Sequence, residues 1–563
     1  MQDKKLEDCS REELISIIKS IKKQKKFGLV WEDKPEKVAM DCKEKLPVLN
    51  EDASKAIIKS PGQPTNIIIE GDNFHSLSAL NYTHSGKIDI IYIDPPYNTG
   101  SKDFTYNDKI VDKEDSFRHS KWLSFMNKRL QLAKTLLKND GLILISIDDN
   151  EQSQLKLLCD AIFGEQNFVE TFIWEKNPNP TFLNKYSRSS AEYILCYAKN
   201  KLTGLLSLDG GIITSLETDA PLQNRGNPKR KICIKSGMAK ALFRDQHIKA
   251  GNYGLVDVLD DIDFKNNTNV NDFAIEGTFR MTQETLYERI ENGEQLLFKT
   301  PRMSPRLSYS ANTAHSAPLK TLWSNKYGTT QIGNNDIKDI FKALPFSYPK
   351  PVKLIKGLLS FKNSKDIVVL DFFAGSGTTG QAVLELNRED NGNRRFIICT
   401  NNESNIAEEV TYLRINTVIT GERNDGSKYS SGIPTNLRYF KTSFIEKEET
   451  LDKLRRKLSP ACEDMIRVRE GVFNKRIDED LFKVFEENGQ IVGIIYDRFE
   501  LEKYIDQIEK LETDKSVHLY VFSYDNNGRF DEVTKTTKHK YECQPIPEGV
   551  LEIYKKIFKD RRY

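Results

Sequence analysis

The tetrapeptide Asp94-Pro95-Pro96-Tyr97 places a carboxylate and an aromatic ring on a stiff turn. Isoleucine predominates over residues 88–93 just before it, which is typical of a strand buried on both faces of a parallel sheet. Because proline cannot donate to a sheet ladder, the strand must end at this turn. We therefore expect the acid and the tyrosine at the carboxyl edge of a sheet, where open α/β folds bind ligands.

A turn of this composition suits methyl transfer to the exocyclic amine of a nucleic-acid base. Such an amine is a poor nucleophile because its lone pair is delocalised into the ring. Asp94 and the Pro95 carbonyl can accept hydrogen bonds from its N–H groups, and a fixed carboxylate stabilises the charge that develops on nitrogen. Tyr97 offers a flat face for an extruded base, a contact worth roughly 1–3 kcal/mol. The alternative is a strand-ending turn with a surface tyrosine.

A second turn with chemical potential runs from Asp371 to Thr379, between a buried strand pattern at 367–370 and a helical pattern at 381–386. Its glycines let the backbone approach a ligand closely. The glycine spacing is neither that of the dinucleotide fingerprint nor that of a triphosphate loop. The next strand pattern, 396–399, is followed by Glu403, an acid placed to bind ribose hydroxyls.

A third strand pattern, at 67–69, leads to Asp72. This acid also lies at a strand's carboxyl edge, where it can accept a hydrogen bond from the adenine amine of a cofactor. It can equally be the N-cap of a helix that starts near Phe74. The sequence leaves these two interpretations open.

The composition bounds the class of protein. A chain of 563 residues with 38% hydrophobic and 29% charged residues predicts several soluble domains with buried cores. No apolar run approaches the roughly 18 residues of a membrane span, and the first residues lack a signal-peptide core. The eight cysteines form no Cys-x-x-Cys pair, which favours a reducing cytoplasm and argues against a zinc site, so no metal is predicted.

The α/β rhythm occupies two segments, 61–200 and 345–440, which we interpret as halves of one doubly wound, mostly parallel sheet. Right-handed crossovers would bring Asp94 and Gly375 to the same crevice. Residues 201–344, rich in turns, are predicted to form an inserted domain. Residues 1–60 are predicted to be a helical appendage that can contact a second copy, and 441–563 an α+β assembly module.

Basic residues gather within the inserted region, although the net charge of the chain is only +2. Residues 224–249 hold many lysines and arginines against a single acid, Asp245, and further basic residues follow at 299–306. Such a segment suits contacts with DNA phosphates and base edges, and a solvated surface is the alternative. The candidate DNA-binding residues are Arg225, Lys229, Arg230, Lys231, Arg302 and Arg306.

The two turns together resemble the D-P-P-Y and F-x-G-x-G signatures of DNA amino-methyltransferases, here Asp94–Tyr97 and Phe373–Gly377. The order, with the catalytic motif first and the glycine loop last, is similar to that of the β group of these enzymes. Further stretches are most similar to the modification (Mod) subunit of Type III restriction–modification systems: 70–73, 92–100, 118–122, 146–149, 27–31 and 347–351.

This resemblance implies the methyltransferase fold that uses S-adenosylmethionine, with a circularly permuted motif order. The residues implied to bind that cofactor are Phe373, Gly375, Gly377 and Thr378, with Asp371 at its methionine end, Glu403 at its ribose and Asp72 at its adenine. The residues Asp94, Pro95, Pro96 and Tyr97 would act on N6 of an adenine flipped out of double-stranded DNA. The resemblance also implies a homodimer, a restriction subunit with helicase and nuclease activity, and the prokaryotic cytoplasm.

Three alternatives stay open at this point. Transfer to cytosine N4 uses the same kind of pocket, although D-P-P-Y more often accompanies adenine. An RNA methyltransferase would prefer single strands or loops, whereas the large inserted domain favours duplex recognition. A DNA-specificity subunit without catalysis is the third, and the intact Asp94 and glycine loop argue against it.

Overall fold

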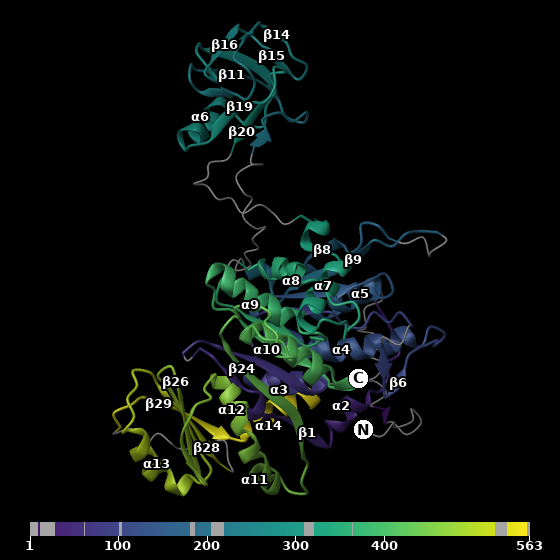
Figure 1. Cartoon of the computed structure of the whole chain (residues 1–563), viewed down its shortest axis with the longest axis vertical. Helices are drawn as coiled ribbons and strands as arrows, with labels where there is room; N and C mark the ends of the chain where they lie inside the picture. Colours follow the sequence, from purple (N-terminus) through teal and green to yellow (C-terminus); the bar gives the residue numbers. More distant parts are fainter. Residues whose placement is uncertain are drawn as a thin grey trace. The chain divides into compact units, whose positions relative to one another are not determined.

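A computed structural model describes residues 10–11, 29–60, 62–100, 104–180, 186–203, 219–308, 320–362, 364–523 and 537–559. The chain divides into two compact units, one of residues 1–207 and 320–563 and the other of residues 208–319 (Figure 1). The inserted unit is therefore shorter than the predicted 201–344. Residues 320–344 belong to the first unit, where β21 (Leu322–Trp323) pairs with β8 (Phe168–Glu175).

The first unit is built on a sheet with the order β1-β24-β3-β23-β22-β4-β7-β9-β8-β21, and β2 pairs with β24. The strands from β24 to β7 are parallel, whereas β1, β9 and β8 pair antiparallel with their inner neighbours. The bounds are β1 (Lys45–Glu51), β2 (Ile57–Ile58), β3 (Thr65–Glu70), β4 (Ile88–Ile93), β7 (Leu137–Ile147), β9 (Ala191–Ala198), β22 (Val368–Asp371), β23 (Arg395–Thr400) and β24 (Asn436–Glu446). The predicted doubly wound, mostly parallel sheet is confirmed.

Strands β4 and β22 are neighbours in this sheet. Val369 pairs with Ile90 and Leu370 with Ile91, in parallel register. Every residue of both strands is buried, as their near-continuous apolar runs predict for strands covered on both faces. The two turns that follow these strands therefore leave the sheet side by side at one edge.

Helices cover both faces of the sheet. On one face, α4 (Arg118–Leu136) packs between α3 (Asn73–Thr83) and α5 (Gln152–Phe163). On the other, α9 (Thr378–Asp390) packs against α8 (Val352–Leu359) and α10 (Leu413–Thr420), and α7 (Thr330–Phe341) contacts α10. Successive residues of β23 face opposite sides of the sheet. Ile397 belongs to the hydrophobic core on the side of α3, α4 and α5, whereas Ile398 faces α9, where a Cβ on Gly380 would lie 3.4 Å from it.

The two ends of the chain are more closely joined to the sheet than their description as appendages predicts. Strands β1 and β2, from the segment predicted as an appendage, extend the sheet beside β24. Most of the first 28 residues of this predicted appendage, positions 1–9 and 12–28, lie outside the described residues. At the other end, the buried Tyr554 of α14 (Glu548–Lys559) donates a hydrogen bond to the carbonyl of Pro47 in β1.

The C-terminal region adds a second sheet of five strands, β25-β26-β27-β28-β29, drawn in yellow-green and yellow in Figure 1. Helices α12 and α14 of this region pack on α3. Its remaining bounds are α11 (Leu451–Ala461), α12 (Glu463–Glu470), β25 (Lys475–Glu479), β26 (Phe482–Glu487), β27 (Gln490–Ile495), α13 (Leu501–Ile508), β28 (Val517–Phe522) and β29 (Tyr541–Ile546). Among the described helices of the chain, none is both long enough and apolar enough to cross a membrane.

The second unit consists mainly of short strands, with one helix, α6 (Gln283–Glu291), in its described part. Its two sheets have the orders β10-β20-β19-β12-β17-β16-β13 and β11-β18-β15-β14. The bounds are β10 (Asp219–Pro221), β11 (Lys229–Ile234), β12 (Ala239–Ala241), β13 (His247–Ile248), β14 (Gly251–Asn252), β15 (Val256–Val258), β16 (Ile262–Lys265), β17 (Thr268–Asn269), β18 (Phe273–Thr278), β19 (Gln295–Phe298) and β20 (Pro305–Ser308). Its hydrophobic core is separate from that of the first unit.

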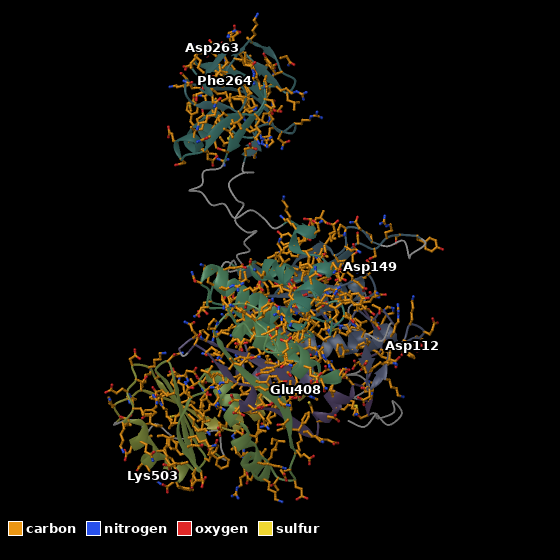
Figure 2. All side chains as sticks on the ribbon, viewed as in Figure 1. Asp112, Asp149, Asp263, Phe264, Glu408 and Lys503 are labelled. Carbon is orange, nitrogen blue, oxygen red and sulfur yellow. The ribbon has the colours of Figure 1, made fainter. Side chains whose placement is uncertain are left out.

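Because the cores are separate, a core defect in the second unit should stay there. Phe264, labelled in Figure 2, is 2% exposed and contacts the rings of Phe243 and Phe298. We expect Phe264→Ala to cost about 3–5 kcal/mol of unfolding free energy in this unit. Hydrogen exchange should show lost protection within 219–308, while the first unit keeps its protection. The half-exposed neighbour Asp263 provides the control, Asp263→Ala, and equal losses in both units would contradict the prediction.

Candidate active site

The carboxyl edge of the main sheet collects acids from several strands. Asp72 follows β3, Glu403 follows β23, and Asp94 follows β4. Because β9 runs antiparallel to β7, the first residues of β9 reach this same edge. They include Glu192, which pairs with Trp174 of β8. The topology therefore gathers acids that are far apart in the sequence.

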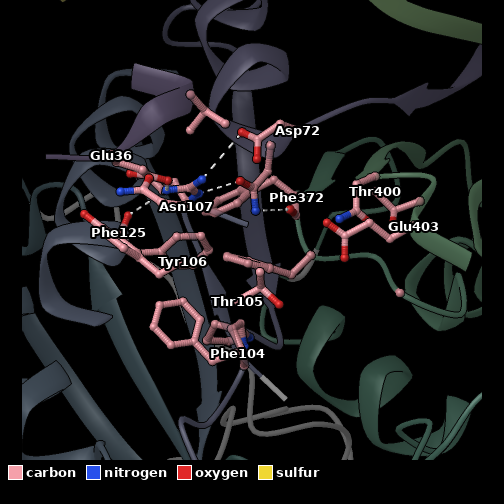
Figure 3. Close-up of a pocket in the computed structure, with 18 of the residues that line it drawn as sticks. Glu36, Asp72, Phe104, Thr105, Tyr106, Asn107, Phe125, Phe372, Thr400 and Glu403 are labelled. Atoms are coloured by element: carbon pink, nitrogen blue, oxygen red, sulfur yellow. Dashed lines mark hydrogen bonds and ion pairs between the residues drawn. The ribbon is translucent and has the colours of Figure 1, made fainter. Parts of the chain in front are cut away.

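A cavity of about 400 Å³ opens at this edge (Figure 3). The predicted site residues that line it are Asp72, Asp94, Pro95, Pro96, Phe373, Gly375 and Glu403. Gly375 has a φ of +49°, and a Cβ there would lie 3.1 Å from the ring of Phe346. Only glycine fits this backbone without strain, so the glycine turn can pass close to the cavity.

The other predicted cofactor residues hold the glycine turn together. The Asp371 carboxylate accepts hydrogen bonds from the Phe373 N–H at 3.0 Å and from the Thr379 hydroxyl at 2.5 Å. Burial raises the pKa of Asp371 to about 7. The Thr378 hydroxyl accepts a hydrogen bond from Arg414 at 2.8 Å, and Gly377 has a φ of +79°. These residues are outside the set that lines the cavity, and their contacts shape its wall.

Both interpretations of Asp72 have structural support. Its carboxylate accepts a hydrogen bond from the Phe74 N–H at 2.7 Å, which makes it the N-cap of α3. It also lines the cavity, and its side chain is 31% exposed. The helix cap therefore fixes the orientation of an acid that can still meet a ligand.

A buried arginine on the cavity wall escaped the sequence reasoning. Arg129 is fully buried; its guanidinium lies 2.8 Å from Glu36 and also contacts Asn73 and, at 3.5 Å, Asp72. It stacks on the Phe125 ring, with its central carbon 3.6 Å from the ring centroid. No local motif marks these residues, because the contacts form only once α4 meets segments far away in the sequence.

A second cavity, of about 890 Å³, shares Asp94, Pro95 and Pro96 with the first. Tyr97, Glu192 and Lys350 line only this second cavity, together with Trp174, Lys176, Phe346 and Tyr348 among others. Asp94 therefore borders both cavities. A group held in one cavity can react with a group held in the other beside this carboxylate.

Lys350 is the centre of a charged cluster around Asp94. Its ammonium nitrogen Nζ lies 2.8 Å from both carboxylate oxygens of Asp94 and 3.4 Å from Glu192. The other oxygen of Glu192 lies 3.0 Å from the Nζ of Lys176. The Tyr97 hydroxyl oxygen lies 2.9 Å from Asp94 and 3.1 Å from Glu192, so its one proton is shared between these two acceptors, and Lys350 donates to that hydroxyl. These bonds fix the orientation of the Tyr97 ring.

The protonation states follow from burial and pairing. Burial raises the pKa of Asp94, with Lys350 opposing the shift. Burial also works against the charge of Glu192, but Lys350 and Lys176 outweigh it and lower the pKa of this acid. Burial disfavours the charged form of Lys350, yet Asp94 and Glu192 prevail and raise its pKa. Lys350 and Glu192 are therefore both charged near neutral pH.

Neither Lys350 nor Glu192 has a role that is predicted from the sequence. Lys350 belongs to the stretch at 347–351 that carries part of the family resemblance, and Glu192 belongs to no motif. Another unforeseen contact fixes the turn itself, because the Trp122 indole donates to the Pro96 carbonyl at 2.7 Å. The separation of Lys350 from Asp94, 256 residues, shows why no local pattern could reveal the pair.

The candidate DNA-binding residues of the second unit fall into two groups. Lys229 pairs with Asp257 and Glu276, and Arg306 pairs with Asp219. Arg230 donates a hydrogen bond to a backbone carbonyl, that of Phe279. The side chains of the other group, Arg225, Lys231 and Arg302, are exposed. The exposed group is the better placed to meet an external anion.

A doubly wound α/β sheet, a glycine turn, and an acidic turn between two cavities define the class of a group-transfer enzyme that brings two ligands together. Residues 88–412 match the family described as DNA methylase, N6_N4_Mtase. The chain belongs to this family.

Curated relatives agree with the assignment. The chain is 33% identical over 357 residues to the Type III restriction-modification enzyme StyLTI Mod subunit of Salmonella typhimurium, covering 60% of this chain and 52% of that protein. It is 31% identical to the EcoPI Mod subunit of Escherichia phage P1 over 60% of this chain and 58% of that protein. The chain thus spans little more than half the length of these two relatives.

A third relative is covered more fully. Type II methyltransferase M.KpnI of Klebsiella pneumoniae is 30% identical over 351 residues, which are 61% of this chain and 82% of that protein. Among solved structures, the M1.HpyAVI-SAM complex aligns over 62% of this chain and 99% of that chain, with 15% identity and a TM-score of 0.29. That overlap is too weak to add to the assignment.

The charged cluster predicts a pH-dependent loss of stability on removing Lys350. Lys350→Met leaves the buried Glu192 and the partly exposed Asp94 without their shared cation, and we expect a loss of at most about 3–5 kcal/mol near neutral pH. Burial then raises the pKa of both acids, so the folded variant keeps protons that the unfolded chain releases. The deficit should shrink as the pH falls toward about 4, the range of ordinary carboxyls.

Denaturant titrations at pH 5 and pH 8 measure this deficit. Lys176→Met is the matched control, since it removes only the outer ion pair to Glu192 and should cost less. A Lys350→Met deficit that is equal at both pH values would refute the proposed pairing.

Proposed function

We propose that this chain is a site-specific DNA methyltransferase that transfers a methyl group from S-adenosylmethionine to N6 of an adenine in duplex DNA. We further propose that it is the modification and specificity subunit of a Type III restriction–modification system. The observation that carries the proposal is the position of Asp94, which borders both cavities at the junction of the two turns. Membership of the DNA methylase family supports it.

The residues of the first cavity fit S-adenosylmethionine. Its volume, about 400 Å³, falls in the range of roughly 300–1,000 Å³ of small-molecule sites. The carboxylates of Asp72, Asp94 and Glu403 suit a ligand with cationic groups and ribose hydroxyls, and Phe373 adds an apolar face. Gly375 leaves the backbone free to approach. When bound, the cofactor supplies a methyl group on a positively charged sulfur.

The second cavity holds the groups that a flipped adenine needs. The Tyr97 ring, oriented by its bonds to Asp94 and Glu192, offers a stacking face. The Asp94 carboxylate and the Pro95 carbonyl can accept the two N–H groups of the amine, which localises the lone pair on nitrogen. Asp94 also stabilises the positive charge that forms there, and Lys350 offsets the cost of burying that carboxylate.

The second unit is proposed to recognise the target sequence. Its exposed Arg225, Lys231 and Arg302 are suited to phosphate contacts, which position a protein on DNA. The resemblance to Mod subunits motivates the further proposals of a homodimer and of a restriction subunit as partner. It also motivates the proposal that the protein works in the prokaryotic cytoplasm.

The reaction is tested with the purified chain, labelled S-adenosylmethionine and unmethylated plasmid, followed by nucleoside analysis and modification-aware sequencing. The proposal expects N6-methyladenine at one recurring motif. The family name covers both N6 and N4, so label in N4-methylcytosine would correct the target atom. DNA without any label would refute the proposed activity.

The acidic turn predicts the effect of a conservative substitution. Asp94→Asn keeps the shape of the side chain but removes the charge that stabilises the amine, so transfer should fall at least about 100-fold. Cofactor affinity, measured by calorimetry, should change much less. The control is Asp89→Asn, a buried acid at the opposite end of β4 that pairs with Lys138. Unchanged turnover in Asp94→Asn would rule out the mechanism.

If the exposed basic residues of the second unit contact DNA phosphates, their removal should weaken the salt dependence of DNA binding. Replacing Arg225, Lys231 and Arg302 together by alanine should reduce the slope of log K against log salt by about 2–3, since each lost phosphate contact contributes about 0.9. Lys229→Ala is the matched control, because this exposed lysine already pairs with Asp257 and Glu276. Equal slopes in the triple variant and the wild type would remove these residues from the interface.

A further inference from the structure

A buried acid lies next to the Asp94–Tyr97 turn, and neither motif contains it. Glu151 follows β7 and directly precedes α5, and it is fully buried. It lines neither cavity, so its carboxyl group does not meet a ligand held there. Its contacts are instead with residues that hold the turn.

The first of these contacts is with Asn98, the residue directly after Tyr97. The Asn98 amide donates to Glu151 Oε1 at 2.5 Å, and Asn98 is itself 1% exposed. Asn98 has a φ of +57°, in the left-handed region, which asparagine adopts more readily than other residues that carry a side chain. Because the side chain of Asn98 is buried, its hydrogen bonds decide how this part of the chain is fixed. The hydrogen bond from Asn98 to Glu151 therefore fixes the residue that directly follows Tyr97.

The second contact joins Glu151 to helix α4. The His119 Nδ1 lies 2.6 Å from Glu151 Oε1. Three residues further along the same helix, Trp122 donates to the Pro96 carbonyl. Helix α4 therefore anchors the turn twice, once directly through Trp122 and once through Glu151 and Asn98.

The charged and titratable groups that face Glu151 are Arg118 and His119 of α4 and Asp148 at the end of β7. Burial raises the pKa of Glu151 to about 8, while Asn98 and Arg118 oppose the shift and Asp148 adds to it. Burial, with help from Arg118, lowers the pKa of His119. Near neutral pH the pair is therefore mostly an uncharged carboxyl group beside an uncharged imidazole.

We propose that Glu151 is a positioning residue for the methyl transfer: through Asn98 it holds the Asp94–Tyr97 turn in the shape that the reaction requires. This inference rests on the proposed function, since it assigns a role to Glu151 in that same site. Without Glu151, the buried amide of Asn98 would lose this hydrogen bond, and the chain directly after Tyr97 would lose its connection to helix α4 through Glu151. The adjacent Tyr97 and the Asp94 carboxylate would then move away from the substrate amine.

The test compares Glu151→Ala and Glu151→Gln with the wild-type full-length chain in single-turnover transfer to plasmid DNA. Glu151→Ala should slow transfer about 10- to 100-fold, because misplacement by about 1 Å can cost this much. Cofactor affinity should stay within about threefold, since Glu151 lies outside the first cavity. Glu151→Gln should recover most of the rate, because its amide oxygen can still accept from Asn98.

A matched control separates positioning from general loss of stability. Glu51 of β1 is another buried glutamate, paired at 2.8 Å with Arg438 and with Arg467. Glu51→Ala should lower the unfolding midpoint and leave the transfer rate unchanged at temperatures where the variant is folded. A rate loss in Glu51→Ala equal to that in Glu151→Ala would overturn the proposal.

Measuring stability and transfer rate as a function of pH provides a second test. A general loss of stability caused by substitutions elsewhere would not produce the pH dependence expected from Glu151. The pKa of Glu151 is raised from 4.5 to about 8 in the folded protein. The protonated carboxyl group therefore stabilises the fold fully below pH 4.5, and this contribution is lost as the pH rises to about 8. Glutamine does not titrate. The unfolding midpoint of the wild type should therefore fall relative to that of Glu151→Gln between pH 5 and pH 8, and the transfer rate of the wild type alone should change near pH 8.

The outcomes distinguish this inference from the function on which it rests. The wild-type chain by itself decides whether DNA is methylated, and its failure would overturn the proposed function. Where the wild type is active, the Glu151 proposal is decided by the ratios of the variants to it. A folded Glu151→Ala that transfers at the wild-type rate would overturn the proposal, as would a Glu151→Gln that is as slow as Glu151→Ala.

Discussion

The site depends on the partly buried ion pair between Lys350 and Asp94. Burying a carboxylate alone is costly, and the cost falls only when a cation and hydrogen bonds compensate it. Lys350 contacts both oxygens of Asp94 and also faces Glu192, so one ammonium group allows two acids to line the same cavity. The pair also joins the two halves of the main sheet, which the inserted unit separates along the chain.

The sheet topology explains how an insertion of this size is compatible with one active site. The chain leaves the first half after β9 and returns through β21, and both strands lie toward the edge of the sheet, next to β8. The strands that carry the two turns, β4 and β22, lie in the middle as parallel neighbours. The insertion therefore interrupts the sequence of the sheet without interrupting the pairing that brings Asp94 close to the glycine turn.

The features predicted from the sequence are those with local signatures. The buried strands, the proline-ended turn and the glycine turn each depend on residues within about ten positions, and the sheet confirms their setting. The features missed are long-range: Glu192 and Lys350 meet Asp94, and Arg129 meets Glu36, only in the folded chain. The predicted end of the inserted domain at residue 344 was wrong, because the chain already returns to the main sheet at β21. This strand has only two residues, which is too short to show a hydrophobic pattern in the sequence.

The electrostatic balance of the cluster gives Glu192 a physical purpose in the proposed reaction. Asp94 must stabilise positive charge on the amine, yet the ammonium of Lys350 lies 2.8 Å from the same carboxylate and repels that charge. Glu192 is held anionic by Lys350 and Lys176, so that, when Asp94 is ionised, two cations face two anions and the cluster is neutral before the reaction. Because Lys350 interacts with Glu192 as well as with Asp94, it neutralises only part of the negative charge of Asp94. The remaining negative potential can stabilise positive charge on the amine. A fixed, neutral cluster also needs little reorganisation when the charge appears, which is the condition for effective electrostatic stabilisation.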